Sequence, residues 1–251
     1  MTSSLLSVRH LHKAFGGVQA VRDISFQVEP GQMVALIGPN GAGKSTCFNL
    51  VNGQLHPDRG EVWLGDRRID GLAPRQIWRA GVGRTFQIPA TFASLTVREN
   101  LQVALASYHR RAWAFWRPLG SQFHDEAHAL LAQVGMDTQA TRPCAELAYG
   151  DVKRVELAVA LAGRPRLLLM DEPTAGMAPH ERHALMDLTR QLVDQHRLGV
   201  LFTEHSLDVV FRHADQLVVM ARGEHVASGA PAAVAQHPDV RQVYLGSYQP
   251  A

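Results

Sequence analysis

A glycine-rich segment lies between a predicted strand and a predicted helix near the start of the chain. The apolar run Met33–Ile37 is typical of a buried strand. It is followed by Gly38-Pro39-Asn40-Gly41-Ala42-Gly43-Lys44-Ser45-Thr46 and then by a helical stretch over 47–51. Glycines let consecutive backbone N–H groups turn toward one anion, and the N-terminus of the following helix adds partial positive charge. The order strand, GxxxxGKS, helix therefore predicts a phosphate-binding loop.

Two side chains of this loop have distinct expected roles. We expect the Lys44 ammonium to reach the β- and γ-phosphates of a nucleoside triphosphate, and the Ser45 hydroxyl to bind Mg²⁺. The alternative is a chance glycine-rich turn. From average residue frequencies, the fixed positions of the motif would arise in about one in a hundred chains of this length. The flanking strand and helix make that coincidence rarer still.

A second predicted strand ends in two carboxylates. The run Leu167-Leu168-Leu169-Met170 is followed directly by Asp171 and Glu172. Ligands of parallel sheets lie beyond the carboxyl ends of the strands, so both acids are expected beside the phosphate-binding loop. Asp171 would hold Mg²⁺ directly or through water, and Glu172 would accept a proton from an attacking water. The alternative, two acids capping the turn before Pro173, becomes weaker beside a phosphate-binding loop. The pair predicts an ATPase or a GTPase.

The wider pattern predicts an α/β fold with a P-loop nucleoside-triphosphatase core, in which helices cover a mostly parallel sheet. Continuous apolar runs, as expected for its buried strands, occur at 33–37, 167–170, 200–203 and 217–220. Helical periodicity follows the second run, with one apolar face marked by Leu185, Leu188, Leu192 and Val193. Three short β-rich segments separated by turn residues predict an N-terminal antiparallel β subdomain, at 5–8, 24–29 and 61–65.

The middle of the chain differs in character. Residues from about 90 to 160 are rich in helix formers and predict an inserted α-helical subdomain, with helices over 96–107 and 124–134. We therefore expect one domain over 1–251, in which about 1–89 and 161–251 form the core and the antiparallel subdomain. A short helix is expected from Pro231.

Charge and cysteine content exclude several classes of protein. Lys and Arg total 25 against 23 Asp and Glu. The arginines are scattered without a basic tail, so no nucleic-acid partner is expected.

Cys47 and Cys144 lie far apart without zinc or CxxC spacing and are expected to be free thiols in a reducing compartment. The N-terminus lacks a signal-peptide core, and no run approaches the roughly 20 apolar residues of a membrane span, so any membrane role would depend on a partner. His124 and His128 could form a metal pair, but a solvated helix face is the simpler interpretation.

Together these motifs resemble the ATP-binding-cassette (ABC) transporter ATPases over nearly the whole chain. Gly83-Arg84-Thr85-Phe86-Gln87 is similar to that family's Q-loop. The resemblance implies that Gln87 touches Mg²⁺ and senses the γ-phosphate, while the residues after it face a membrane partner. Thr203-Glu204-His205 is similar to the switch segment, in which His205 links the γ-phosphate, the attacking water and the opposing subunit. Phe15 stands where the family stacks an aromatic ring on adenine, although a core phenylalanine is the alternative.

Two further segments resemble the family but depart from its common form. Leu147-Ala148-Tyr149-Gly150-Asp151 occupies the position of the LSGGQ signature, before the helix-like segment VKRVELAVALAG. The resemblance implies that Ala148, Tyr149, Gly150 and Asp151 contact the nucleotide of a second subunit. Asp151 replaces an amide with an anion, which would weaken attraction to a triphosphate unless it caps its own helix. Ala175-Gly176-Met177-Ala178 fills the D-loop position without its usual Asp.

The resemblance also implies cofactors, partners and location. ATP and Mg²⁺ would be bound by two ATPase subunits that close head to tail, as a homodimer or a heterodimer. They would drive separate transmembrane permease subunits at the cytoplasmic face of the inner membrane, supplied indirectly by a substrate-binding protein. The Q-loop and residues 88–117 are the candidate permease surface. Trp113, Phe115 and Trp116 would either anchor it or pack inside the helical subdomain.

Three features point to one branch of this family. LAYG at 147–150, TAGM at 174–177 and the tail over 237–246 are similar to ATPases of branched-chain amino acid importers. ATPases for urea, aromatic acids or lipopolysaccharide resemble them. Two rival classes are a non-transport ABC ATPase acting on nucleic acid and a module that binds ATP without turnover. Glu172 and His205 argue against the second class.

Overall fold

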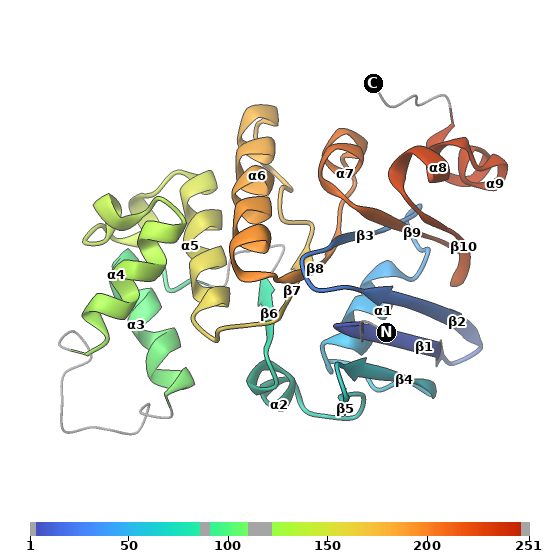
Figure 1. The fold of residues 1–251 in the computed structure, drawn as a ribbon, viewed down its shortest axis with the longest axis horizontal. Helices are drawn as coiled ribbons and strands as arrows, with labels where there is room; N and C mark the ends of the chain where they lie inside the picture. The colour runs from blue at the N-terminus through green and yellow to red at the C-terminus, as the bar shows by residue number, and fades with distance from the viewer. Residues whose placement is uncertain (1–3, 86–90, 110–121, 247–251) are drawn as a thin grey trace.

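The computed structural model describes residues 4–85, 91–109 and 122–246 (Figure 1). Two sheets organise these residues, one with strand order β2-β1-β4-β5 and one with order β10-β9-β3-β8-β7-β6. The strands of the first are β1 (Leu6–Phe15), β2 (Val18–Val28), β4 (Arg59–Leu64) and β5 (Arg67–Arg68). The strands of the second are β3 (Met33–Ile37), β6 (Val82–Thr85), β7 (Leu167–Asp171), β8 (Gly199–Thr203), β9 (Gln216–Ala221) and β10 (Glu224–Gly229).

Helices cover both sides of the second sheet. They are α1 (Lys44–Val51), α2 (Pro74–Arg79), α3 (Val97–Tyr108), α4 (His124–Gln133), α5 (Tyr149–Leu161), α6 (Pro179–His196), α7 (Leu207–His213), α8 (Pro231–Gln236) and α9 (Pro238–Val240). Two 3₁₀ turns, at Asp137–Gln139 and Cys144–Glu146, and a π-helical turn at Arg241–Leu245 complete the described elements. Within these ranges, no helix is both long and apolar enough to cross a bilayer.

The larger sheet is parallel from β9 to β6, and β10 joins its edge antiparallel to β9. Ala35 of β3 stands opposite Phe202 on one side and Leu217 on the other, so β3 lies inside the sheet. All five residues of β3 are buried. Buried parallel strands of this kind are continuous apolar runs, which is why the sequence revealed them. The predicted α/β fold is confirmed.

Period-two alternation divides these strands between two cores. Met33, Ala35 and Ile37 belong to the core that contains side chains of α5, α6 and α7, whereas Val34 and Leu36 belong to the core that contains side chains of α1 and the antiparallel sheet. Figure 1 shows the antiparallel sheet and α1 on one side of the larger sheet, with α6 and α7 on the other. The chain therefore leaves the end of β3 between these two layers and continues through the glycine-rich loop into α1.

The helices of the middle segment begin and end close to the predicted limits. Thr96 caps α3 in a capping box: its hydroxyl accepts from Glu99 N at 3.2 Å, and the Glu99 carboxylate accepts from Thr96 N at 2.8 Å. Figure 1 shows α3, α4 and α5 together at the end of the molecule farthest from α8 and α9. The elements that the sequence did not predict include α2, β5, β6, α7 and β10. These elements are short or weakly apolar, so their local sequence carries little signal, and packing against neighbouring elements determines their secondary structure.

Candidate functional site

The loop between β3 and α1 requires glycine at two positions. Gly38 has φ of 148°, and a Cβ there would overlap the carbonyl oxygen of Met220 on β9. Gly43 has φ of 97° at the N-cap of α1, and a Cβ there would overlap the carbonyl oxygen of Ala20 on β2. The loop is thus pressed between the neighbouring strand and the β1–β2 hairpin. Only residues without a Cβ allow this approach.

Lys44 folds back onto its own loop. Its ammonium donates to the carbonyl oxygens of Gly38 at 2.7 Å and Pro39 at 3.1 Å, and the residue is 7% exposed. Burial lowers the pKa of Lys44, while the nearby carboxylates of Glu172 and Asp171 act in the opposite direction. A partly desolvated cation held at the mouth of a glycine loop is suited to binding an anion.

A cavity of about 260 Å³ lies over this loop. Its lining combines loop residues with the two predicted reactive side chains: Ala20, Asn40, Gly41, Ala42, Gly43, Lys44, Ser45, Thr46, Glu172 and His205. The lining therefore unites four segments that are far apart in sequence. Gly38 and Pro39 are not among the lining residues, and their carbonyl oxygens accept hydrogen bonds from the Lys44 ammonium.

Asp171 ends β7 and is held from the next strand. Its Oδ1 accepts a hydrogen bond from the Thr203 hydroxyl at 2.8 Å, and the two residues are register partners. The Arg84 guanidinium, at the end of β6, lies 3.8 Å from Asp171 Oδ2. Burial lowers the pKa of Arg84, against the effect of Asp171. Thr203 and Arg84 were not predicted as site residues. Their register with Asp171 across the sheet is invisible in the linear sequence.

Glu172 adopts a strained backbone conformation beside the loop. Its φ of 48° lies in the left-handed region, which non-glycine residues rarely occupy outside constrained sites. Its backbone N–H donates to Thr203 O and to Thr203 Oγ1, both at 3.1 Å. These bonds aim the side chain so that Oε1 lies 2.8 Å from His205 Nε2. With Glu172 ionised, His205 Nε2 carries the proton of this hydrogen bond.

Glu204 lies behind this pair and was also missed as a site residue. It is 3% exposed, and its Oε1 accepts from Thr174 N at 2.9 Å and from Thr174 Oγ1 at 2.6 Å. Its Oε2 accepts from His205 N at 3.1 Å. The buried Glu204 carboxylate thus joins Thr174, which lies between Glu172 and the D-loop, to the backbone of His205 in the switch segment. In the sequence, its position directly before the predicted switch histidine was the only signal that Glu204 belongs to the site.

Phe15 is the last residue of β1 and is 48% exposed, so the core alternative is wrong. Asp58 fixes the strand end on which it stands. The Asp58 carboxylate accepts from Lys13 Nζ and from Ala14 N, both at 2.7 Å. The Lys13 ammonium lies 5.7 Å from the centre of the Phe15 ring. These bonds lower the pKa of Asp58. An exposed aromatic ring remains available for stacking.

The signature residues lie at the N-terminus of α5. The helix begins at Tyr149 with Ala148 at its N-cap, three residues earlier than the sequence indicated. Asp151 occupies the first turn, and α5 has no side-chain cap, so Asp151 does not cap its helix. A carboxylate there is still favoured by the helix dipole. A Cβ on Gly150 would lie 3.2 Å from Glu181 Oε1 of α6. None of Ala148, Tyr149, Gly150 and Asp151 is among the described residues lining the phosphate-loop cavity.

Several predicted residues lie outside the described ranges, namely Gln87, Trp113, Phe115 and Trp116. Residues 91–109 of the candidate permease surface over 88–117 are described, and Phe92 among them is 56% exposed. Asn100 of α3 holds its backbone, with Oδ1 accepting from Phe92 N at 2.8 Å. His124 and His128 are exposed, and His124 pairs with Arg98 at 3.0 Å. The described ranges contain no group of three or more metal-ligating side chains.

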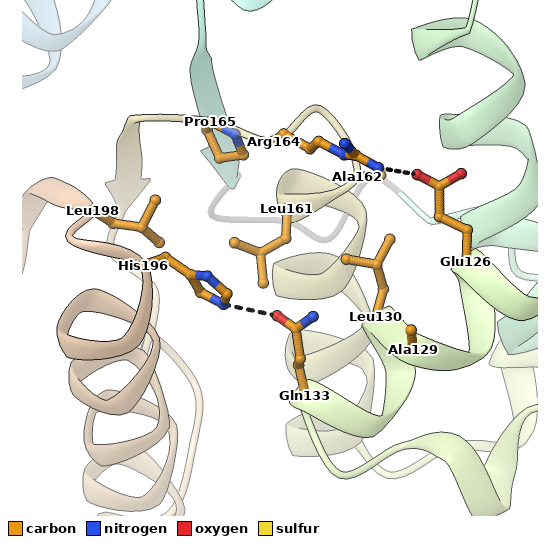
Figure 2. Close-up of a pocket in the computed structure, with 10 residues that line it drawn as sticks. All are labelled: Glu126, Ala129, Leu130, Gln133, Leu161, Ala162, Arg164, Pro165, His196 and Leu198. Carbon is orange, nitrogen blue, oxygen red and sulfur yellow. Dashed lines mark hydrogen bonds and ion pairs between the residues drawn. The ribbon is translucent and has the colours of Figure 1, made fainter.

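A separate cavity of about 390 Å³ lies between α4 and the ends of α5 and α6 (Figure 2). Its rim is closed on both sides by internal contacts. Arg164 pairs with Glu126 at 3.1 Å, and His196 pairs with Gln133 at 3.1 Å. Leu130, Leu161 and Leu198 line it together with other apolar side chains. None of the described residues that line it belongs to the phosphate-binding loop over 38–46, so the cavity is no part of the phosphate-binding site.

Comparisons with known proteins agree with this geometry. Residues 21–175 match the family model described as ABC transporter. Residues 224–248 match the model described as branched-chain amino acid ATP-binding cassette transporter. The chain is 38% identical over 254 residues to the high-affinity branched-chain amino acid transport ATP-binding protein LivG of Escherichia coli, covering 98% of this chain and 99% of that one. It is also 38% identical over 256 residues to BraF of Pseudomonas aeruginosa, with the same coverage.

Solved structures extend the likeness to the fold. The ADP conformation of MJ1267, an ATP-binding cassette of an ABC transporter, superposes with a TM-score of 0.86 at 30% identity, covering 97% of this chain and 99% of that one. A nucleotide-free ATP-binding cassette from an ABC transporter gives a TM-score of 0.85 at 30% identity, covering 97% of this chain and 100% of that one. Together with the glycine loop, the carboxylates of Asp171 and Glu172 and the contact between Glu172 and His205, these matches show that the chain belongs to the ABC transporter family as an ATP-hydrolysing cassette.

Proposed function

We propose that this ATPase drives uptake of branched-chain or closely related amino acids through separate membrane subunits. Support for the substrate class comes from the C-terminal match over 224–248 and from the names of LivG and BraF. The transported molecule does not contact the cassette in this proposal. Its identity is therefore set by the permease and by a substrate-binding protein.

The 2.8 Å contact between Glu172 Oε1 and His205 Nε2 carries the proposed hydrolytic mechanism. Lys44 binds the β- and γ-phosphates and neutralises their charge. Glu172 accepts a proton from the water that attacks the γ-phosphate, and His205 orients Glu172 and contacts the γ-phosphate. Phe15 stacks on the adenine ring from the exposed end of β1.

The donor set beside the loop fits Mg²⁺. Hydroxyl and carboxylate oxygens are the ligands that this hard cation prefers, and Ser45 and Asp171 supply one of each. Thr203 Oγ1 orients the Asp171 carboxylate at 2.8 Å. Gln87 is a third candidate ligand. Bound Mg²⁺ would neutralise charge on the β- and γ-phosphate oxygens.

The exposed N-terminus of α5 supports a head-to-tail pair of cassettes. Ala148, Tyr149, Gly150 and Asp151 lie away from the cavity of their own chain, and Tyr149 is 43% exposed. We assign them to the nucleotide held by a second ATPase subunit. Backbone N–H groups at the start of α5 would contact its γ-phosphate. One chain alone would therefore hydrolyse ATP slowly.

Phe92 supports a permease surface at the segment after the Q-loop. A large apolar side chain that is 56% exposed and follows a nucleotide-sensing segment is suited to a protein interface. The cassette would then act at the cytoplasmic face of the cell membrane. Phe92→Ala should weaken assembly with the permease while ATP binding by the cassette is unchanged. Phe15→Ala, at another exposed ring, should show the reverse pattern.

Reconstitution tests the substrate class directly. The full chain would be placed in proteoliposomes with permease subunits, a second cassette, ATP and a substrate-binding protein. We expect uptake of radiolabelled leucine, isoleucine or valine that stops in Glu172→Gln. Uptake of urea or an aromatic acid instead would contradict the substrate proposal. Absence of ATP-dependent closure between cassettes would contradict the mechanism.

A further inference from the structure

Arg182 joins the two segments that flank the hydrolytic pair. It lies in the first turn of α6 and is partly buried. Its Nε donates to the carbonyl oxygen of Met177 at 2.8 Å, and its Nη1 donates to the Ser206 hydroxyl oxygen at 2.8 Å. Met177 belongs to the D-loop, and Ser206 directly follows His205. One guanidinium therefore spans from the segment after Glu172 to the segment that carries His205.

The acceptor of this bridge is itself fixed. Ser206 occupies the N-cap position of α7, yet its hydroxyl makes no capping bond. The hydroxyl donates instead to Asp208 Oδ1 at 2.8 Å. The other oxygen of that carboxylate, Asp208 Oδ2, lies 3.3 Å from His183 Nε2 on α6. With its proton committed to Asp208, the Ser206 oxygen presents its lone pairs to Arg182.

A second link joins the same two segments on the buried side. Glu204 binds both Thr174, directly before the D-loop, and the backbone N–H of His205. The carbonyl oxygen of Glu172 accepts from Ala175 N at 3.1 Å, so the first residue of the D-loop is hydrogen-bonded to Glu172. Glu204 thus fixes the near end of the D-loop to the switch segment, and Arg182 fixes the far end. Both links therefore lie between the segment that follows Glu172 and the segment that carries His205.

We propose that Arg182 is a positioning residue that sets the Glu172–His205 contact by holding the D-loop against the switch segment. The planar guanidinium presents Nε and Nη1 at a fixed angle, so it fixes the separation of its two acceptors. This D-loop lacks an Asp side chain that could make such a link, and Arg182 provides it from the neighbouring helix. The inference rests on the proposed roles of Glu172 and His205. It adds a residue that is not among the described residues lining the cavity over the phosphate-binding loop.

Steady-state kinetics of the full chain test the proposal. We expect Arg182→Gln and Arg182→Lys to lower kcat by about 5- to 30-fold, because small displacements of reacting groups are costly. Lysine keeps the charge but has one nitrogen and cannot fix both acceptors. KM for MgATP should stay within about twofold, since neither bond reaches the phosphate-binding loop. Ser206→Ala should reproduce the loss, and Ser206→Thr, which keeps the hydroxyl, should restore most of kcat.

Matched controls separate positioning from general stabilisation. Arg212 also links α7 to α6, through Asp187 at 3.4 Å, but touches neither the D-loop nor the switch segment. Arg212→Gln should leave kcat unchanged. The double variant Arg182→Gln with Ser206→Ala should have a kcat no lower than that of Arg182→Gln alone, because the Arg182 change already removes the bond to Ser206. An unchanged kcat in Arg182→Gln, additive losses or an equal loss in Arg212→Gln would each overturn the proposal.

Hydrogen exchange gives a readout that does not depend on turnover. In Arg182→Gln and in Ser206→Ala, amides of 175–178 and of 204–208 should exchange faster together. Amides of the phosphate-binding loop over 38–46 should be unchanged. Faster exchange confined to α6 would show that Arg182 only stabilises its own helix. Failure of the unmodified chain to hydrolyse ATP would instead count against the proposed function. The exchange pattern can be measured without ATP hydrolysis, so the two outcomes are distinguishable.

Discussion

The Thr203 hydroxyl donates a hydrogen bond to Asp171 Oδ1 at 2.8 Å, across the paired ends of β8 and β7. The same hydroxyl accepts from Glu172 N at 3.1 Å. One side chain therefore sets both the proposed Mg²⁺ ligand and the backbone of the proposed general base. The parallel register of two strands that are distant in sequence produces this arrangement.

Thr203→Val should impair catalysis without abolishing folding. The valine side chain has the same shape but neither donates to Asp171 nor accepts from Glu172 N, which keeps its bond to the carbonyl oxygen of residue 203. We expect kcat to fall by about tenfold and unfolding free energy to fall by about 1 to 3 kcal/mol, as for removal of a partner from buried polar groups. ATPase assays and urea denaturation would measure these effects. Thr203→Ser keeps the hydroxyl and should behave nearly as the unmodified chain.

Glu172→Gln should separate nucleotide binding from hydrolysis. The amide cannot take a proton from water, so turnover should fall by about 10²- to 10⁴-fold. MgATP binding and ATP-dependent pairing should persist and can be measured by fluorescence titration and size-exclusion chromatography. Lys44→Ala should instead impair binding of the triphosphate itself. Turnover unchanged in Glu172→Gln would remove this residue from the role of base.

Gly43→Ala should damage the phosphate-binding loop. The left-handed φ of 97° is costly for alanine, and its Cβ would meet the carbonyl oxygen of Ala20. The loop would shift, and we expect at least about a tenfold loss of ATP affinity, equivalent to about 1.4 kcal/mol. Gly17→Ala is the matched control, because nothing lies within 4 Å of a Cβ there and its φ is not left-handed. Equal affinities in the two variants would contradict this account.

His213 should make the fold sensitive to acid. It is 7% exposed, and burial lowers its pKa from 6.5 to about 4. Asp187 opposes this lowering, whereas His183, Arg212 and Arg190 reinforce it. Since the unfolded chain binds this proton more readily, the stability contributed by neutral His213 is complete above about pH 6.5. It should be lost as pH falls toward 4, by roughly 2 to 3 kcal/mol.

Urea denaturation at several pH values would test this sign. His213→Gln has no titrating ring, so its unfolding free energy should fall less steeply than that of the unmodified chain between pH 6.5 and 4. The comparison cancels the contribution of carboxylates common to both proteins. Parallel curves for the two proteins would show that His213 does not drive the loss.

Local sequence was sufficient for the elements whose chemistry is contiguous. The Met33–Ile37 strand, the loop at 38–46 and the start of α1 follow from apolar character, glycine and helix signals within one short stretch. The capping box at Thr96 and Glu99 likewise sets the start of α3. Prediction was less accurate where local signals were weak. Ala148 has no capping side chain, and the start of α5 was placed three residues too late.

The sequence by itself determined the phosphate-binding loop, the paired acids at the end of β7 and the alternation that builds an α/β core, because each depends on neighbouring residues. Only the tertiary structure decided that Glu172 meets His205, that Thr203 orients Asp171 and that Arg182 joins Met177 to Ser206. These contacts depend on strand order, register and helix orientation. Such features arise from packing between segments far apart in the chain, which a linear pattern of residue types does not encode.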